Sequence, residues 1–105
     1  EPDVARARVL RANLLRCGVT EFLAPRVDGR EVGALAPGAF GLVLVDAPCS
    51  SEGNVRKDGR AWDWWRRPGR ARELRRLTDL QWALIDSGWR ALRPGGCLVY
   101  IPRAR

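Results

Sequence analysis

A carboxylate and a thiol stand three residues apart at the end of an apolar run. Residues 42–50 read Leu-Val-Leu-Val-Asp-Ala-Pro-Cys-Ser, so Asp46 follows four apolar residues and Cys49 follows a proline. Pro48 fixes its own φ at about −65° and keeps Ala47 out of the helical region, which makes the turn stiff. A thiolate can act as a nucleophile and a carboxyl group can hold or donate a proton. The pair is therefore placed for chemistry on a substrate.

The elements around this pair predict a parallel α/β sheet. Residues 41–45 form an unbroken apolar run, which is typical of a strand covered on both faces. Leucines at helical spacing predict a helix over 74–92 that Pro94-Gly95 ends, and residues 97–101 predict a further strand. A helix between two strands is the crossover that parallel pairing requires. In such sheets, ligands bind beyond the carboxyl ends of the strands, where Asp46 and Cys49 stand.

The first part of the chain predicts a helix, a short strand and a loop. The helix is expected over 3–17, with acidic residues and Pro2 in its first turn and Gly18 just past its end. Residues 22–27 predict a short strand that a proline interrupts. Residues 28–39 are expected to form a turn and a loop, and residues 47–69, rich in proline and glycine, a long loop.

Residues 46–58 resemble the signature of the RsmB/NOP2/Sun family of RNA (cytosine-5) methyltransferases. The similarity is greatest to the bacterial enzymes that methylate small-subunit ribosomal RNA. The matching residues are Asp46-Ala47-Pro48-Cys49-Ser50, followed by Glu-Gly-Asn-Val-Arg-Lys-Asp at 52–58. The resemblance continues through residues 11–19, 28–30 and 92–100. It implies the central strands and helices of a Rossmann-like, S-adenosylmethionine-dependent methyltransferase domain. On this interpretation, residues 1–105 lack the first strand with its glycine-rich turn and the C-terminal strands.

Methylation of cytosine at C5 needs covalent catalysis, because that carbon is not nucleophilic in the resting ring. A thiolate adds to C6, C5 then takes a methyl group from a sulfonium donor, and a base removes the C5 proton before the thiol leaves. In the family, the cysteine of the Asp-Ala-Pro-Cys motif assists product release. The resemblance therefore assigns this role to Cys49. It places Asp46 near the target base and the amino group of the donor.

The nucleophile of the family lies in a second motif, Thr-Cys-Ser, after a strand that ends in Leu-Val-Tyr-Ser. Here Leu98-Val99-Tyr100 is present, but Ile101-Pro102 follows and Arg103 stands where the cysteine is expected. An arginine cannot add to C6 and return. Three interpretations follow: the chain is inactive, Cys49 makes the attack, or the end records a frameshift or truncation. We favour the last, because the agreement stops abruptly after Tyr100.

The resemblance also assigns residues to the donor and to the RNA. It places Glu1 at the ribose hydroxyls, Asp28 beside the adenine and Asp46 near the donor's amino group. A carboxylate suits a diol because it accepts two hydrogen bonds. From the residues alone, Glu1 is equally well a helix-start charge and Asp28 a turn former. Arginine and lysine in a loop are also commonly just solvated. The candidate RNA contacts are Pro48, Arg56 and Lys57.

Charge is concentrated in one stretch and suggests an RNA partner. The net charge is +7, and residues 56–76 hold nine Arg or Lys against three carboxylates. Trp62, Trp64 and Trp65 are interleaved with these cations. Guanidinium groups beside aromatic rings suit phosphate contact and base stacking, although a solvated arginine-rich loop has the same composition. Ribosomal RNA is the favoured substrate, and transfer RNA is the next candidate. The alternative functions are a catalytically inactive RNA-binding remnant or a methyltransferase acting on protein or DNA.

Other compositional features bound the environment. No apolar run approaches the roughly 18–20 residues of a membrane span, so we expect no membrane partner. The chain has three cysteines without a CxxC pair and no histidine. This argues against a metal site and for a reducing, cytoplasmic compartment. Cys17 and Cys97 are expected to pack as small apolar side chains. The sequence makes no prediction of oligomeric state.

We expect residues 1–105 to be a segment of a larger domain, because a parallel sheet of so few strands exposes apolar surface and open edges. The glycine-rich turn that would approach the methionine part of the donor is absent from the sequence. We therefore predict that the 105-residue chain alone binds S-adenosylmethionine weakly or not at all. Isothermal titration calorimetry measures this directly, and a micromolar dissociation constant would contradict the prediction.

Overall fold

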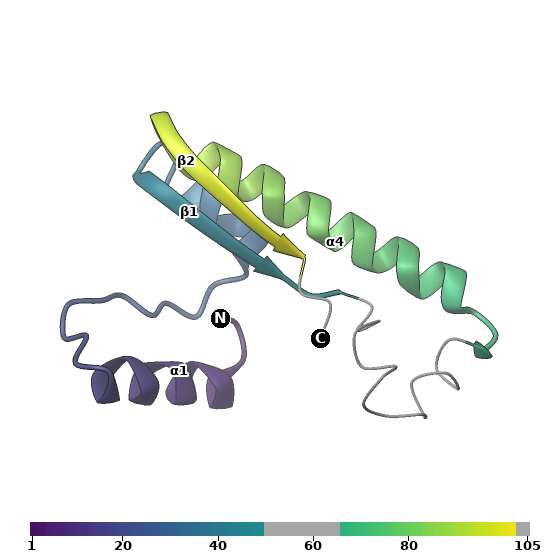
Figure 1. The fold of residues 1–105 in the computed structure, drawn as a ribbon, viewed down its shortest axis with the longest axis horizontal. Coiled ribbons are helices and arrows are strands. Elements are labelled where there is room, and N and C mark those ends of the chain that lie inside the picture. The colour runs from purple at the N-terminus through teal and green to yellow at the C-terminus, as the bar shows by residue number, and fades with distance from the viewer. Residues whose placement is uncertain (50–65, 103–105) are drawn as a thin grey trace.

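The computed structural model describes residues 1–49 and 66–102, and these form one βαβ unit with a separate N-terminal helix (Figure 1). Strands β1 and β2 pair in parallel, and helix α4 crosses from one to the other. This arrangement confirms the predicted α/β class and a partial Rossmann-like fold. The elements are α1 (Val4–Arg16), η1 (Gly29–Glu31), α2 (Val32–Leu35), β1 (Phe40–Ala47), α4 (Arg70–Ala91) and β2 (Leu92–Pro102).

Helix α1 begins and ends close to the predicted positions. Asp3 is its N-cap, and the Asp3 carboxylate accepts a hydrogen bond of 2.8 Å from the backbone N–H of Arg6. Pro2 therefore precedes the cap instead of lying in the first turn. At the other end Gly18 has a φ of +78°, a left-handed conformation that glycine adopts without strain. No residue of α1 is buried.

Two predictions for residues 22–39 are wrong. Residues 22–28 form no strand. A strand needs a neighbour, and the sheet of the described residues pairs β1 with β2 alone. Residues 29–35, expected to be turn and loop, form the short helices η1 and α2. They do so because Asp28 caps η1 through a 2.9 Å hydrogen bond from the N–H of Arg30, and because α2 is held against α4.

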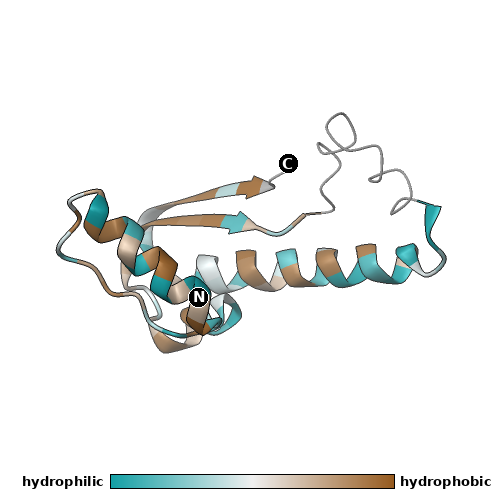
Figure 2. Cartoon of the chain, turned by 90° about the horizontal axis from the view of Figure 1, so that it is seen from below, coloured by the Kyte–Doolittle hydropathy of each residue, from teal (hydrophilic) through white to brown (hydrophobic). Residues whose placement is uncertain are grey.

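One face of the sheet packs on α4. The parallel register places Val43 opposite Leu98 and Val45 opposite Tyr100. A Cβ atom built on Gly88 of α4 would lie 3.2 Å from methyl groups of Val43, Val45 and Leu98. A glycine at this position therefore lets the helix approach the strands closely, and Figure 2 shows α4 as a layer beneath both strands.

The other face of the sheet is open in the part of the chain that the structure describes. Leu42 is 65% exposed and Leu44 is 61% exposed, and Val99 and Ile101 on β2 are exposed as well. The expectation that β1 is covered on both faces is therefore wrong for these residues.

The radius of gyration is 16.2 Å, against about 13 Å for a compact domain of this length. Apolar residues that could form a core thus remain at the surface.

Ser87 joins α4 to the segment before β1. Its side chain is fully buried, and its Oγ atom donates to the carbonyl of Gly29 at 2.7 Å and accepts from the N–H of Gly33 at 2.9 Å. The backbones come so close that a Cβ atom on Gly33 would lie 2.4 Å from the Ser87 carbonyl oxygen. The fully satisfied hydroxyl therefore fixes η1 and α2 on the helix.

We predict that Ser87→Ala lowers the free energy of unfolding by about 1–3 kcal/mol, because it leaves a buried N–H and a carbonyl without their partner. Thr78→Ala is the matched control, since the exposed Thr78 hydroxyl donates only to the Leu74 carbonyl of the same helix. Its cost should stay within about 0.5 kcal/mol. Urea unfolding followed by circular dichroism measures both changes. Equal losses in the two variants would contradict the role of Ser87.

Candidate active site

Asp46 lies within β1 and not after it, because the strand continues two residues beyond the predicted end at Val45. Side chains alternate along a strand, and Ala47 is 1% exposed on the face toward α4. Asp46 consequently belongs to the open face, together with Leu42 and Leu44, and it is exposed. Its partner across the ladder is Ile101. The carboxylate is thus presented near the carboxyl end of β1, on the side away from the helix.

The segment that carries Cys49 is hydrogen-bonded to α4. The Nε2 atom of Gln81 donates a 2.8 Å hydrogen bond to the carbonyl oxygen of Pro48. Cys49 itself is half-buried, so its thiol is neither fully presented nor sealed in the interior. Gln81 was not among the site residues predicted from the sequence. The feature of the sequence that could have identified it is that Gln81 is a polar residue on the otherwise apolar face of the crossover helix.

Glu1 and Asp28 are brought close together at the start of the chain. The backbone nitrogen of Glu1 lies 3.3 Å from the carbonyl oxygen of Val27, the residue before Asp28. The Glu1 carboxylate accepts a hydrogen bond of 3.2 Å from the N–H of Asp3 and forms an ion pair of 3.3 Å with Arg6. Its described contacts are therefore those of a charge at a helix start.

Both carboxylate oxygens of Asp28 are bound by one guanidinium group. Nε of Arg30 lies 3.0 Å from Oδ1 and 3.1 Å from Oδ2, and one terminal nitrogen lies 2.6 Å from Oδ2. These side-chain hydrogen bonds, followed by the backbone N–H of Arg30, lower the pKa of Asp28 from 3.8 to about 2. The carboxylate is therefore ionised and oriented without a ligand.

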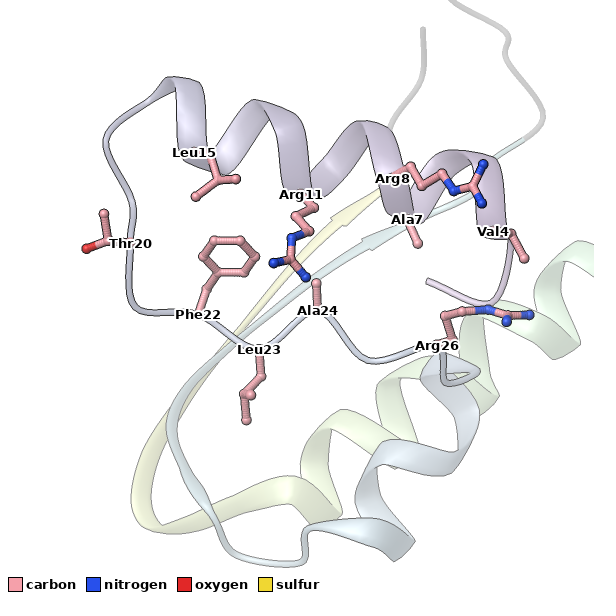
Figure 3. Close-up of a pocket in the computed structure, with 10 residues that line it drawn as sticks. All are labelled: Val4, Ala7, Arg8, Arg11, Leu15, Thr20, Phe22, Leu23, Ala24 and Arg26. Atoms are coloured by element: carbon pink, nitrogen blue, oxygen red, sulfur yellow. The ribbon is translucent and has the colours of Figure 1, made fainter.

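A groove of about 430 Å³ lies between α1 and residues 20–26 (Figure 3). Its lining combines apolar side chains with Arg8, Arg11 and Arg26. None of the predicted site residues Glu1, Asp28, Asp46, Pro48 and Cys49 lines it. The groove and the Asp46–Cys49 motif are therefore separate features of the molecule.

The two cysteines outside the motif are not buried, and several predicted RNA contacts lie outside the described residues. Cys17 and Cys97 are exposed, so the expectation that they pack as buried side chains is wrong. The reason is that α1 buries none of its residues and that Cys97 belongs to the open face of the sheet, opposite Leu42. Arg56, Lys57, the three tryptophans at 62–65 and Arg103 lie outside the described residues.

The described residues provide neither a metal site nor a membrane-spanning helix. Within residues 1–49 and 66–102, no group of three or more His, Cys, Asp or Glu side chains is arranged to hold a metal ion. Over the same residues, none of the helices combines the length and the apolar character that a membrane span requires.

We predict that Arg30→Gln raises the pKa of Asp28 from about 2 back toward 3.8, because the variant removes the guanidinium that stabilises the ionised carboxylate. Since the folded-state pKa is depressed, the stabilisation by this pair is present above pH 4 and is lost as the pH falls through about 2. Carbon-13 NMR of the Asp28 carboxyl group measures the titration. Arg26→Gln is the control and should leave it unchanged. A midpoint near 3.8 in the unmodified chain would contradict the pairing.

Comparison with known proteins identifies the family. Residues 1–102 match the family model described as 16S rRNA methyltransferase RsmB/F. Over 100 residues the chain is 44% identical to ribosomal RNA small subunit methyltransferase F of Serratia proteamaculans, 46% to that of Erwinia tasmaniensis and 45% to that of Klebsiella pneumoniae. Each match covers 95% of this chain and 20% of the relative, so the chain spans about a fifth of their length.

The fold has a solved counterpart as well. The crystal structure of PH0851 superposes with a TM-score of 0.79 at 28% sequence identity, over 95% of this chain and 22% of that one. Fold, motif and sequence similarity agree, and the chain belongs to the 16S rRNA methyltransferase RsmB/F family.

Proposed function

We propose that this chain carries the first catalytic motif and part of the donor pocket of an S-adenosylmethionine-dependent RNA cytosine-5 methyltransferase. The observation that supports it best is the place of the motif. Asp46 and Cys49 stand at the carboxyl end of β1, in a parallel βαβ unit of a chain from this family. That end of a parallel sheet is where α/β proteins bind substrates. Small-subunit ribosomal RNA is the proposed substrate, as the names of the relatives suggest.

The proposed reaction assigns different steps to the two motif residues. When a thiolate adds to C6 of cytosine, negative charge develops on the ring, and a carboxyl group at the N3 edge stabilises it. Asp46 has this role, since it is exposed near the carboxyl end of the strand. After methyl transfer, the Cys49 thiolate takes the C5 proton. The electron pair restores the C5–C6 double bond, and the bond from C6 to the attacking sulfur breaks.

The donor supplies an activated methyl group on a sulfonium, and the acids near the chain start would hold it. Glu1 and Asp28 fit hydroxyl and amino groups, because carboxylates are hydrogen-bond acceptors. Their proximity supports a shared role. Each Asp28 oxygen already accepts two hydrogen bonds from Arg30, so a group of the donor would have to share or displace Arg30 at this carboxylate. Pro48, Arg56 and Lys57 are the proposed RNA contacts.

A segment exchange tests this proposal in a complete enzyme. Residues 1–102 of this chain replace the matching segment of ribosomal RNA small subunit methyltransferase F of Escherichia coli, to which the chain is 46% identical over 100 residues. We expect the chimera to transfer labelled methyl groups to 16S ribosomal RNA. Asp46→Asn should lower turnover by about 10²–10⁴-fold, the range for loss of a general acid or base. Cys17→Ala is the matched control, because Cys17 is exposed at the C-terminal end of α1. This variant should leave turnover unchanged.

Cys49→Ala in the same chimera separates the two roles of that thiol. If Cys49 assists release, the variant should stop turnover and accumulate a covalent protein–RNA complex, visible on a denaturing gel, because another thiol still attacks C6. Loss of turnover without such a complex would assign the attack to Cys49 itself. A chimera that binds the RNA but never transfers a methyl group would contradict the proposal and favour the RNA-binding remnant.

A further inference from the structure

A hydrogen bond connects the crossover helix to the motif. Gln81, half-buried on α4, donates from Nε2 to the carbonyl oxygen of Pro48 at 2.8 Å. The two residues are 33 positions apart, so the contact is made by tertiary structure. Gln81 belongs to the side of α4 that faces the sheet. It stands two helical turns before Gly88, which contacts Val43 and Val45.

The lengths of helix and strand explain why Gln81 reaches this carbonyl. A crossover helix runs opposite to the strands that it connects, so earlier residues of α4 lie beside later residues of β1. Seven residues of helix from Gly88 back to Gln81 span about 10.5 Å. Three residues of extended chain from Val45 on to Pro48 span about 10 Å. The position of Gln81 is thus set by the contact at Gly88.

The bond supplies a restraint that the proline ring cannot. The ring fixes φ of Pro48 but leaves its ψ angle to the surroundings. Because the peptide group is planar, holding the Pro48 oxygen also fixes the orientation of the Cys49 amide nitrogen. The ring and Gln81 together therefore fix the backbone that leads into Cys49.

We propose that Gln81 is a positioning residue for Cys49. The predicted effect of Gln81 on catalysis rests on the proposed function. Its predicted effect on the reactivity of Cys49 in the 105-residue chain rests on the hydrogen bond alone. Gln81 acts from a helix that Ser87 and Gly88 hold against the rest of the fold. The motif thereby takes its orientation from α4 as well as from β1.

The first test measures thiol reactivity in the 105-residue chain. Iodoacetamide alkylates all three cysteines, and mass spectrometry of the peptides follows each one separately. Gln81→Met keeps the side-chain length but removes the donor, and it should raise the alkylation rate of Cys49 by about two- to tenfold, the range for one hydrogen bond. The exposed Cys17 and Cys97 are internal references whose rates should not change.

Asp79→Met is the matched control, because it introduces the same side chain at an exposed position of α4. A Cys49 rate that Gln81→Met leaves unchanged or lowers would overturn the inference. The same is true if Asp79→Met raises it equally. A rise at all three cysteines, with a lower melting temperature, would show general loosening of the fold and would also overturn it.

The second test uses the chimera with the Escherichia coli enzyme. Gln81→Met should lower kcat by about two- to tenfold while the KM for the RNA stays constant, because the variant misplaces a reacting group and removes no contact with RNA. An unchanged kcat would overturn the role in catalysis. If the unmodified chimera is inactive while Gln81→Met still alters Cys49 alkylation, the proposed function fails and the positioning of Cys49 by Gln81 stands.

Discussion

The described fold depends on the close approach of α4 at two adjacent residues. At Gly88, the absence of a side chain lets the helix backbone come within van der Waals contact of Val43, Val45 and Leu98. At Ser87, one buried hydroxyl satisfies a donor and an acceptor of the segment before β1. Burying polar groups is costly unless they are paired. These two hydrogen bonds therefore stabilise the fold and also favour this one arrangement of the segment on the helix. Helix, sheet and the segment 29–35 are thereby fixed relative to one another.

The geometry of the candidate site follows from these contacts of α4 at Ser87 and Gly88. The alternation of β1 places Asp46 on the open face and Ala47 on the face toward α4. The Pro48 carbonyl that follows β1 accepts a hydrogen bond from Gln81 on α4. The acid and the thiol are thus oriented by different neighbours, although they are close in sequence. The pleat of β1 places the Asp46 carboxylate on the open face, and α4 binds the carbonyl of the residue before Cys49.

Much of this could be predicted from the sequence, and the errors share one cause. The βαβ unit, both long helices and the motif at the end of β1 followed from periodicity and from proline and glycine positions. The strand over 22–27 was wrong because strand formation needs a neighbouring strand, and none pairs with it among the described residues. Cys17 and Cys97 were expected to be buried, and they are exposed because burial depends on what packs against an element. Gln81 was missed because its partner is 33 residues away.

What the sequence determined by itself is local: where α1 begins and ends, the φ angle that proline fixes at position 48, the Asp28–Arg30 pair within one turn, and the motif that indicates the family. These features need only neighbouring residues, so their energetics are contained in short stretches of chain. The tertiary structure alone decided which face of the sheet is open, how near Glu1 lies to Asp28, and that α4 holds the carbonyl before Cys49. Such facts depend on distances between elements, which follow from how side chains pack when the whole unit has folded.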